Sequence, residues 1–137
     1  MFLLDTNVVS ELRKLRPDEA VRAWLVGVPE NQLFLSAFTI GEIQLGIEKK
    51  REEGDLAMVG ALDNWLGRVV DSYKVIPVSE EIFMKWAQLY HGRPNKFFGD
   101  AIIAATALIH GMTVATRNVR DFAQFPVDTY NPFEYRE

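Results

Sequence analysis

The chain has 137 residues, a net charge of −4 and no cysteine. Its length predicts one domain, residues 1–137, with a substantial core. The lack of cysteine excludes disulfides, thiolate catalysis and cysteine metal sites, and it fits a reducing, cytoplasmic location. The negative charge argues against a module that binds nucleic acid by charge alone. It is compatible with an enzyme whose acidic site recruits metal ions.

No apolar run in the chain is long enough to span a bilayer. The N-terminus has no basic patch that leads into a long apolar segment, so we expect no signal peptide and no membrane association.

Short apolar runs alternate with helical patterns in the first half of the chain. Residues 2–4 are predicted to form a buried strand, because the run is short, apolar and bounded by polar residues. A short helix is expected at 7–14 and another after Pro17, which fits a first helical turn. A second strand is expected at 33–35, followed by a long helix at 37–53.

The second half continues the alternation. The expected elements are a helix over 56–70, an edge strand at 75–78, a helix at 82–90, an irregular loop at 91–98, a buried helix at 101–109, a strand at 112–116, a loop or short helix at 117–122 and a last edge strand at 127–130. This order predicts an α/β fold with a mostly parallel sheet of four to five strands and helices on both faces.

Four carboxylates stand at positions that this fold singles out. Asp5 ends the first strand, Glu42 lies on the helix after the second strand, Asp100 starts the buried helix, and Asp121 follows the fourth strand. Ligands of open α/β sheets bind at the carboxyl ends of the strands. We therefore expect these side chains to converge there.

Each carboxylate also has a purely structural interpretation. Asp5 and Asp100 are suited to capping the helices that follow them. Residues 39–42 fit a capping box, in which Glu42 would help to start its helix. Asp121 by itself fits a solvated loop.

Two glycines suggest a close packing contact beside Glu42. Glycine inside a helix costs about 1 kcal/mol relative to alanine. Gly41 and Gly46 therefore predict that another element approaches this helix closely.

A cluster of carboxylates has a chemical consequence. Crowded carboxylates repel one another, which raises some of their pKa values. A divalent cation neutralises such a cluster, and ligands that are all oxygen favour Mg²⁺ or Mn²⁺. These ions can activate water and clamp the oxygens of a phosphodiester.

The chain resembles PIN-domain ribonucleases, specifically VapC-type toxins of the FitB-like subgroup. The segments that carry the resemblance are Leu3–Asn7, Leu35–Ile47, Asp100–Ala107 and Thr116–Phe122. The resemblance implies a metal-dependent endoribonuclease, the toxin of a type II toxin–antitoxin pair, that hydrolyses RNA with a metal-activated water.

The same resemblance assigns roles to individual residues. Asp5 and Asp100 would be direct metal ligands, Asp121 would act through water, and Glu42 would ligate the metal or position the nucleophile. The polar residues that would orient these carboxylates by hydrogen bonds are Thr6, Asn7, Thr116 and Asn118.

The resemblance also implies partners. We expect a homodimer and a cognate antitoxin whose C-terminal segment covers the active site. Phe38, Leu45, Trp24 and Trp86 are candidates for lining the antitoxin groove, with ordinary core positions as the alternative.

The loop at 91–98 is shorter than the family's usual connection before the third acid. Its basic residues, Arg93 and Lys96, are candidates for contacts with substrate phosphate, and a solvated loop is the alternative.

Two other functions compete with the nuclease. A PIN-fold binding module without turnover predicts a missing acid, but all four are present. A phosphatase with Asp5 as its nucleophile needs a second carboxylate two residues later, where Asn7 stands.

Overall fold

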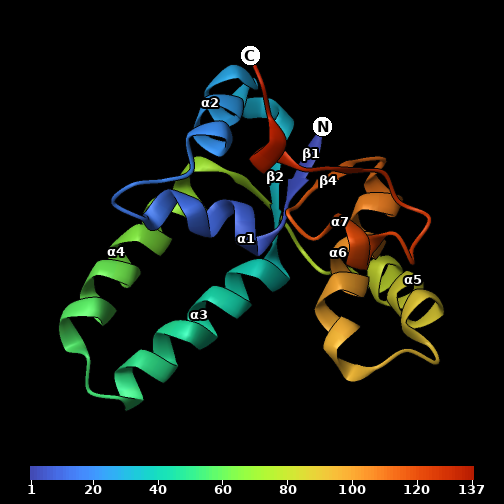
Figure 1. Cartoon of the computed structure of the whole chain (residues 1–137). Helices are drawn as coiled ribbons and strands as arrows, with labels where there is room; N and C mark the ends of the chain where they lie inside the picture. Colours follow the sequence, from blue (N-terminus) through green and yellow to red (C-terminus); the bar gives the residue numbers. More distant parts are fainter.

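The computed structural model describes all 137 residues and contains a five-stranded parallel sheet at its centre (Figure 1). The strands are β1 (Phe2–Leu4), β2 (Leu33–Ser36), β3 (Lys74–Ile76), β4 (Thr113–Ala115) and β5 (Thr129–Tyr130). Their order is β3-β2-β1-β4-β5. The predicted α/β class is confirmed, and the two runs predicted as edge strands form the two edges.

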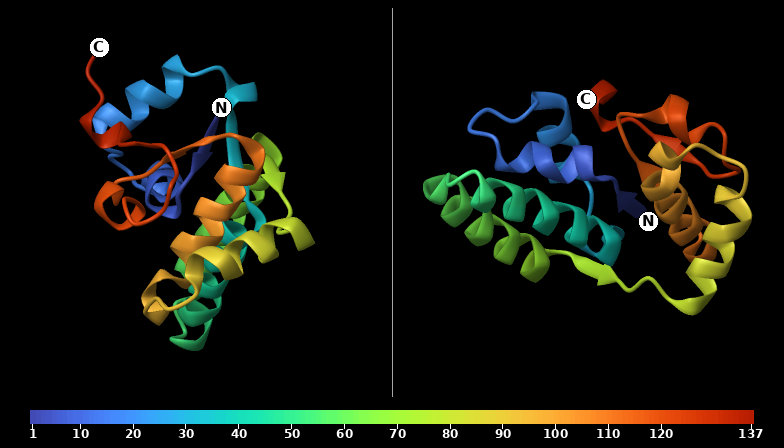
Figure 2. Two further views of the ribbon diagram at one scale, coloured as in Figure 1. Left: turned by 90° about the vertical axis from the view of Figure 1, so that its right-hand side faces the viewer. Right: turned by 90° about the horizontal axis from the view of Figure 1, so that it is seen from below.

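Helices cover both faces of the sheet. They are α1 (Thr6–Val9), α2 (Glu19–Gly27), α3 (Ala37–Glu52), α4 (Leu56–Ser72), α5 (Glu80–Tyr90), α6 (Phe98–His110) and α7 (Val119–Phe122). Short 3₁₀ turns lie at Ser10–Arg13, Glu30–Gln32, Asn95–Phe97 and Pro132–Glu134. Figures 1 and 2 show α1–α4 on one side of β1 and α5–α7 on the other, with α3 and α4 side by side. The structure contains no helix with the length and apolar character needed to cross a membrane.

Two apolar cores lie on the two faces of the sheet. Leu4 packs with residues of α1–α4, whereas its neighbour Leu3 packs with residues of α5–α7. Successive strand residues point to opposite faces, so a central strand buried on both sides reads as a continuous apolar run. This burial places the end of β1, and Asp5 after it, at the middle of the sheet edge.

Helix α6 is buried along most of its length, as its apolar sequence predicts. All seven residues of 101–107 are buried. The helix ends at Gly111, which has a positive φ of 66° and the left-handed conformation that favours glycine at a helix C-terminus. Its N-terminal turn, which carries Asp100, is the part that reaches the sheet edge.

Candidate functional site

Asp5 is held at the junction of β1 and α1. Leu4 pairs with Ala115 of β4, and the Asp5 amide donates to the Ala115 carbonyl at 2.9 Å. The next residues of the two parallel strands, Asp5 and Thr116, are therefore neighbours. The Asp5 side chain caps α1 by accepting from the Thr6 amide at 2.8 Å, so capping and a place in the site coexist.

Hydrogen bonds orient both carboxylate oxygens of Asp5, which is only 7% exposed. Oδ1 accepts the Thr6 amide. Oδ2 accepts the Thr116 hydroxyl at 2.7 Å and the Asn7 amide group at 3.2 Å. The Thr116 hydroxyl in turn accepts the Asn118 backbone N–H at 2.9 Å. The four polar residues that were expected to orient carboxylates thus meet around Asp5, three of them in direct contact with it.

Glu42 reaches the same place from α3. Its Oε1 accepts the Thr6 hydroxyl at 3.0 Å. The capping-box interpretation of Glu42 is wrong, because α3 begins at Ala37 and its cap is Ser36, whose hydroxyl accepts the Phe38 amide. Glu42 therefore lies beyond the first turn, where its carboxylate is available to the site.

The close packing expected at Gly41 and Gly46 occurs elsewhere. No atom lies within 4 Å of a Cβ added at either position. At Gly99, by contrast, an added Cβ would lie 2.9 Å from the Phe38 ring and 3.6 Å from Oε2 of Glu42. The absence of a side chain at Gly99 thus lets the start of α6 approach α3 beside the site.

Asp100 lies in the first turn of α6 and does not cap it, because the helix begins at Phe98 and no side chain caps it. Burial, followed by the charges of Asp5, Asp121 and Glu42, raises the pKa of Asp100 from 3.8 to about 6. Part of the free-energy cost of ionising Asp100 is therefore repulsion from the other three carboxylates.

The pKa values of Asp5 and Glu42 are shifted in the same direction as that of Asp100. Burial raises the pKa of Asp5 against the opposing effect of its hydrogen bonds, that with Thr116 first. The pKa of Glu42 is raised by partial desolvation of its carboxylate and by the charge of Asp5, although the residue as a whole is exposed. Negative charge is thus concentrated at this end of the sheet.

An open polar cavity of about 330 Å³ joins these groups. Its lining residues are Asp5, Thr6, Asn7, Ser10, Glu42, Gly99, Asp100, Ile103 and Asn118. Asp121 does not line the cavity, although its charge contributes to the raised pKa of Asp100. Ser10, Gly99 and Ile103 also line the cavity but were not among the site residues predicted from the sequence. The i,i+4 spacing of Thr6 and Ser10 was an available signal, since such residues share one helix face.

The chemistry of the cavity fits a hard divalent cation. Every candidate ligand is an oxygen, the donor type that Mg²⁺ and Mn²⁺ prefer, and a cation would relieve the repulsion seen at Asp100. As the side chains stand, no three acidic or histidine side chains converge closely enough to hold one ion together. Hydrogen bonds engage both oxygens of Asp5 and one of Glu42. Binding by three of the acids therefore requires a side chain to rotate or a water to bridge.

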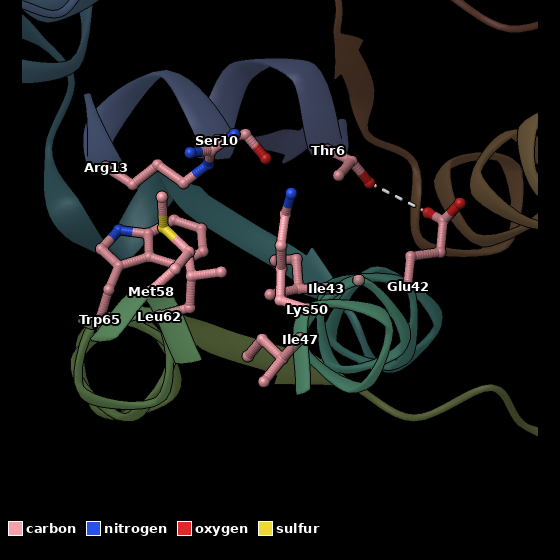
Figure 3. Close-up of a pocket in the computed structure, with 11 residues that line it drawn as sticks. Thr6, Ser10, Arg13, Glu42, Ile43, Ile47, Lys50, Met58, Leu62 and Trp65 are labelled. Carbon is pink, nitrogen blue, oxygen red and sulfur yellow. Dashed lines mark hydrogen bonds between the residues drawn. The ribbon is translucent and has the colours of Figure 1, made fainter. Parts of the chain in front are cut away.

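A second cavity, which we call the α3–α4 groove, adjoins the acidic one and has a volume of about 410 Å³ (Figure 3). It lies between the Thr6–Arg13 segment, α3 and α4, and it shares Thr6, Ser10 and Glu42 with the acidic cavity. Its remaining lining residues are Arg13, Ile43, Gly46, Ile47, Lys50, Met58, Leu62 and Trp65.

The residues proposed from the sequence to line a partner groove are not among these. Trp24 is a core residue, 6% exposed, with its ring edge-on to Phe2. Trp86 stacks on Tyr90, and Phe38 packs against the start of α6. Leu45 is exposed on α3, outside the groove.

The basic residues of the 91–98 loop have different surroundings. Arg93 donates hydrogen bonds to Leu89 and Gln124 within the protein, which does not favour the predicted contact with substrate phosphate. Lys96 is exposed, with its ammonium 5.0 Å from the centre of the Phe97 ring. A phosphate contact of Lys96 stays a prediction.

The chain is similar over nearly its full length to a protein named as a toxin and to a protein named as a VapC ribonuclease. It is 34% identical to Toxin FitB of Neisseria gonorrhoeae, over 97% of this chain and 99% of the relative. It is also 34% identical to VapC ribonuclease Y4jK of Sinorhizobium fredii, over 98% of this chain and 99% of the relative. The crystal structure of FitAcB from Neisseria gonorrhoeae superposes with a TM-score of 0.72 at 32% identity, covering 98% of this chain and 99% of that one. The PIN domain family matches residues 2–127, and the chain therefore belongs to the PIN-domain family.

Proposed function

We propose that this protein is a divalent-metal-dependent endoribonuclease and the toxin of a toxin–antitoxin pair. The observation that carries the proposal is the meeting of Asp5, Glu42 and Asp100 in one polar cavity at the carboxyl end of β1. The match to the PIN family and the similarity to a protein named as a VapC ribonuclease support it. Because the proposed substrate is RNA, we place the reaction in the cytoplasm.

The residues of the chain prepare this site before any ligand binds. Asp5 and Asp100 are the proposed direct ligands of Mg²⁺ or Mn²⁺, and Asp121 the proposed outer ligand through water. When bound, the ion would polarise the phosphodiester and lower the pKa of the attacking water. Thr6 holds the Glu42 carboxylate toward the cavity, where we propose that Glu42 positions that water.

The polar network around Asp5 keeps its carboxylate in one orientation. Hydrogen bonds that orient a metal ligand are typically worth about 10- to 100-fold in metal affinity or activity. We therefore assign Thr116 and Asn7 the role of holding Asp5, and Asn118 the role of holding Thr116, in line with their contacts.

The test is cleavage of a mixed pool of structured RNAs by purified, antitoxin-free protein with and without Mg²⁺ or Mn²⁺. We expect metal-dependent cleavage by the wild type and none by Asp5→Asn. Asp71→Asn on the exposed surface of α4 is the matched control and should cleave normally. Full metal-dependent activity in Asp5→Asn would refute the site.

A folded wild type that cleaves nothing calls for a metal titration by calorimetry. Binding of a divalent ion, weakened in Asp5→Asn, would indicate an RNA target missing from the pool. Absence of ion binding would refute the nuclease and leave a PIN-fold binding module, which the presence of all four acids does not favour.

We also propose that the α3–α4 groove receives the antitoxin segment. The groove has an apolar wall from α3 and α4 and opens beside Glu42 (Figure 3), so a segment seated in it would reach the acidic cavity. Met58 lines the groove and is 39% exposed, whereas Leu56, on the same helix, lies outside it. Met58→Glu should weaken co-purification with the cognate antitoxin, and Leu56→Glu should not.

Exposed apolar side chains on the other side of the molecule support the homodimer that the resemblance implies. Phe83 and Met84 on α5 and Phe98 at the start of α6 are 46%, 61% and 39% exposed. Sedimentation of the wild type and of Met84→Glu tests this proposal, because a charge at a dimer interface should shift the equilibrium toward monomer.

A further inference from the structure

Arg93 connects the loop before α6 to the segment that follows α7. Its Nε donates to the Leu89 carbonyl of α5 at 2.7 Å. Its Nη1 donates to Oε1 of Gln124 at 2.8 Å, and its Nη2 donates to the Gln124 carbonyl at 3.2 Å. The guanidinium also lies over the Phe125 ring, 4.9 Å from its centre. The two Nη groups of Arg93 therefore contact both the side chain and the backbone of Gln124. A lysine cannot reproduce this fork geometry.

Gln124 carries this connection into α7. Its Nε2 donates to the backbone carbonyl of Asp121 at 2.7 Å. An unbroken series of hydrogen bonds thus runs from the end of α5 through Arg93 and Gln124 to Asp121. We call this series the α7 latch.

Helix α7 needs external support. It has only four residues, and no side chain caps its N-terminus. A helix this short is not stable by itself. Phe122 anchors it on the core side, where the ring is fully buried, and the Asn118 N–H before it donates to the Thr116 hydroxyl. The latch holds the turn at a further point, the carbonyl of Asp121.

We propose that Arg93 is a positioning residue for Asp121, acting through Gln124, rather than a contact for substrate phosphate. This inference rests on the proposed nuclease function, in which Asp121 supplies the fourth carboxylate. Asn118, the residue that precedes α7, lines the acidic cavity, whereas Asp121 on α7 does not, so Asp121 lies at the margin of the site. A small rotation of α7 would move it out of range of the other acids.

The contacts of Arg93 separate the two roles. An arginine that binds substrate phosphate presents free N–H groups to solvent beside the site. Arg93 is only partly exposed, and three of its N–H groups are engaged with protein acceptors. Gln124 has no charge with which to attract RNA, so an effect of Gln124 on catalysis would point to positioning.

The experiment compares Arg93→Ala, Gln124→Ala and the double variant with the wild type, all as full-length chains. We expect each single variant to lower kcat about tenfold, the scale of lost support for a metal ligand. KM for RNA should change less than twofold, and the Mn²⁺ concentration for half-maximal rate should rise. The double variant should be no slower than the slower single variant, because both remove the same connection.

Two further variants control for charge and for general structural damage. Arg120→Ala removes an exposed charge from α7 itself and should leave kcat within twofold of the wild type. Arg93→Lys keeps one donor group and should recover part of the lost kcat. Amide hydrogen exchange gives a readout apart from activity: residues 119–125 should lose protection in Arg93→Ala while the buried α6 amides keep theirs.

The outcomes distinguish this proposal from the function on which it rests. A folded wild type that neither cleaves RNA nor binds a divalent ion refutes the nuclease, and the exchange data then decide by themselves whether Arg93 holds α7. An active wild type with a raised KM and weaker salt dependence in Arg93→Ala, but normal Gln124→Ala, would identify a phosphate contact and overturn the proposal. Unchanged protection of 119–125, or lost protection with unchanged kcat, would overturn it as well.

Discussion

Replacement of Asp100 by asparagine should stabilise the protein while it abolishes cleavage. The pKa of this carboxyl group is raised from 3.8 to about 6, by burial first and then by the charges of Asp5, Asp121 and Glu42. At neutral pH the folded protein therefore carries an ionised group in a place that disfavours its charge. Asparagine has nearly the same shape and no charge, so the unfavourable electrostatics disappear with the substitution.

The magnitude follows from the two pKa values. Each pH unit between them corresponds to about 1.4 kcal/mol, which gives an upper bound of about 3 kcal/mol. Asp100 is partly exposed, and screening by solvent and salt reduces the expected gain to about 1–2 kcal/mol. A gain of this size, together with loss of function, is the trade-off expected where a site is built for activity.

The upward direction of the pKa shift determines how the stability difference depends on pH. The pKa is higher in the folded than in the unfolded chain, so the folded state binds more protons between about pH 4 and pH 6. The contribution of the Asp100 carboxyl to wild-type stability is complete below its pKa in the unfolded chain, 3.8, and is lost as pH rises through the folded-state pKa of about 6. The advantage of Asp100→Asn should therefore be full at pH 7.5 and fall to less than half near pH 4.5.

Urea unfolding followed by tryptophan fluorescence, in the presence of a chelator, measures this difference at both pH values. Asp71→Asn on exposed α4 controls for the loss of one negative charge and should show little gain. Added Mg²⁺ should stabilise the wild type by mass action and narrow its gap to Asp100→Asn. A variant that is less stable than the wild type at pH 7.5, or equally stabilised at both pH values, would refute the reasoning.

Three further substitutions test the supporting structure. Thr116→Val removes the 2.7 Å hydrogen bond to the Asp5 carboxylate and should cost about 1.5–3 kcal/mol in urea unfolding, whereas Thr116→Ser should be close to wild type. Gly99→Ala should lower the RNA cleavage rate, because the new Cβ would force the Phe38 ring, 2.9 Å away, to move beside the acidic cavity; an unchanged rate would show that the ring yields freely. Glu11→Gln should lower stability at neutral pH, because the hydrogen bond from Lys14 holds the pKa of the Glu11 carboxyl below its ordinary value of 4.5. The effect should be complete above that ordinary value and be lost as pH falls through the lower folded-state value; a pH-independent effect in thermal unfolding would contradict this.

The sequence predicted the four acids as a set, but it could not say how each would be held. Asp5 serves as helix cap and as site residue together, so these two interpretations were not alternatives. The capping-box interpretation of Glu42 failed because α3 begins earlier, at the Ser36 cap. Local capping patterns fit several overlapping positions, and only the hydrogen bonds of the folded chain select one of them.

The packing and partner surfaces were harder to predict. Gly41 and Gly46 indicated a close approach to α3, yet Gly99 on α6 is the glycine that permits it. Trp24 and Trp86, the candidates for a partner groove, lie outside the α3–α4 groove, whereas Trp65, which was not singled out, lines it. Apolar periodicity shows that a residue faces something, but not which element it faces.

Local rules by themselves determined the alternation of strands and helices, the parallel α/β class and the burial of α6, because these depend on short apolar runs and their spacing. Tertiary structure decided which polar groups meet. The hydroxyl of Thr116 reaches Asp5 across 111 residues of chain only because β1 and β4 pair in register. In the same way, Arg93 was a loop cation in the sequence and became a support of α7 through contacts with Gln124, 31 residues away. Contacts of that range are set by sheet order and core packing, which no local pattern encodes.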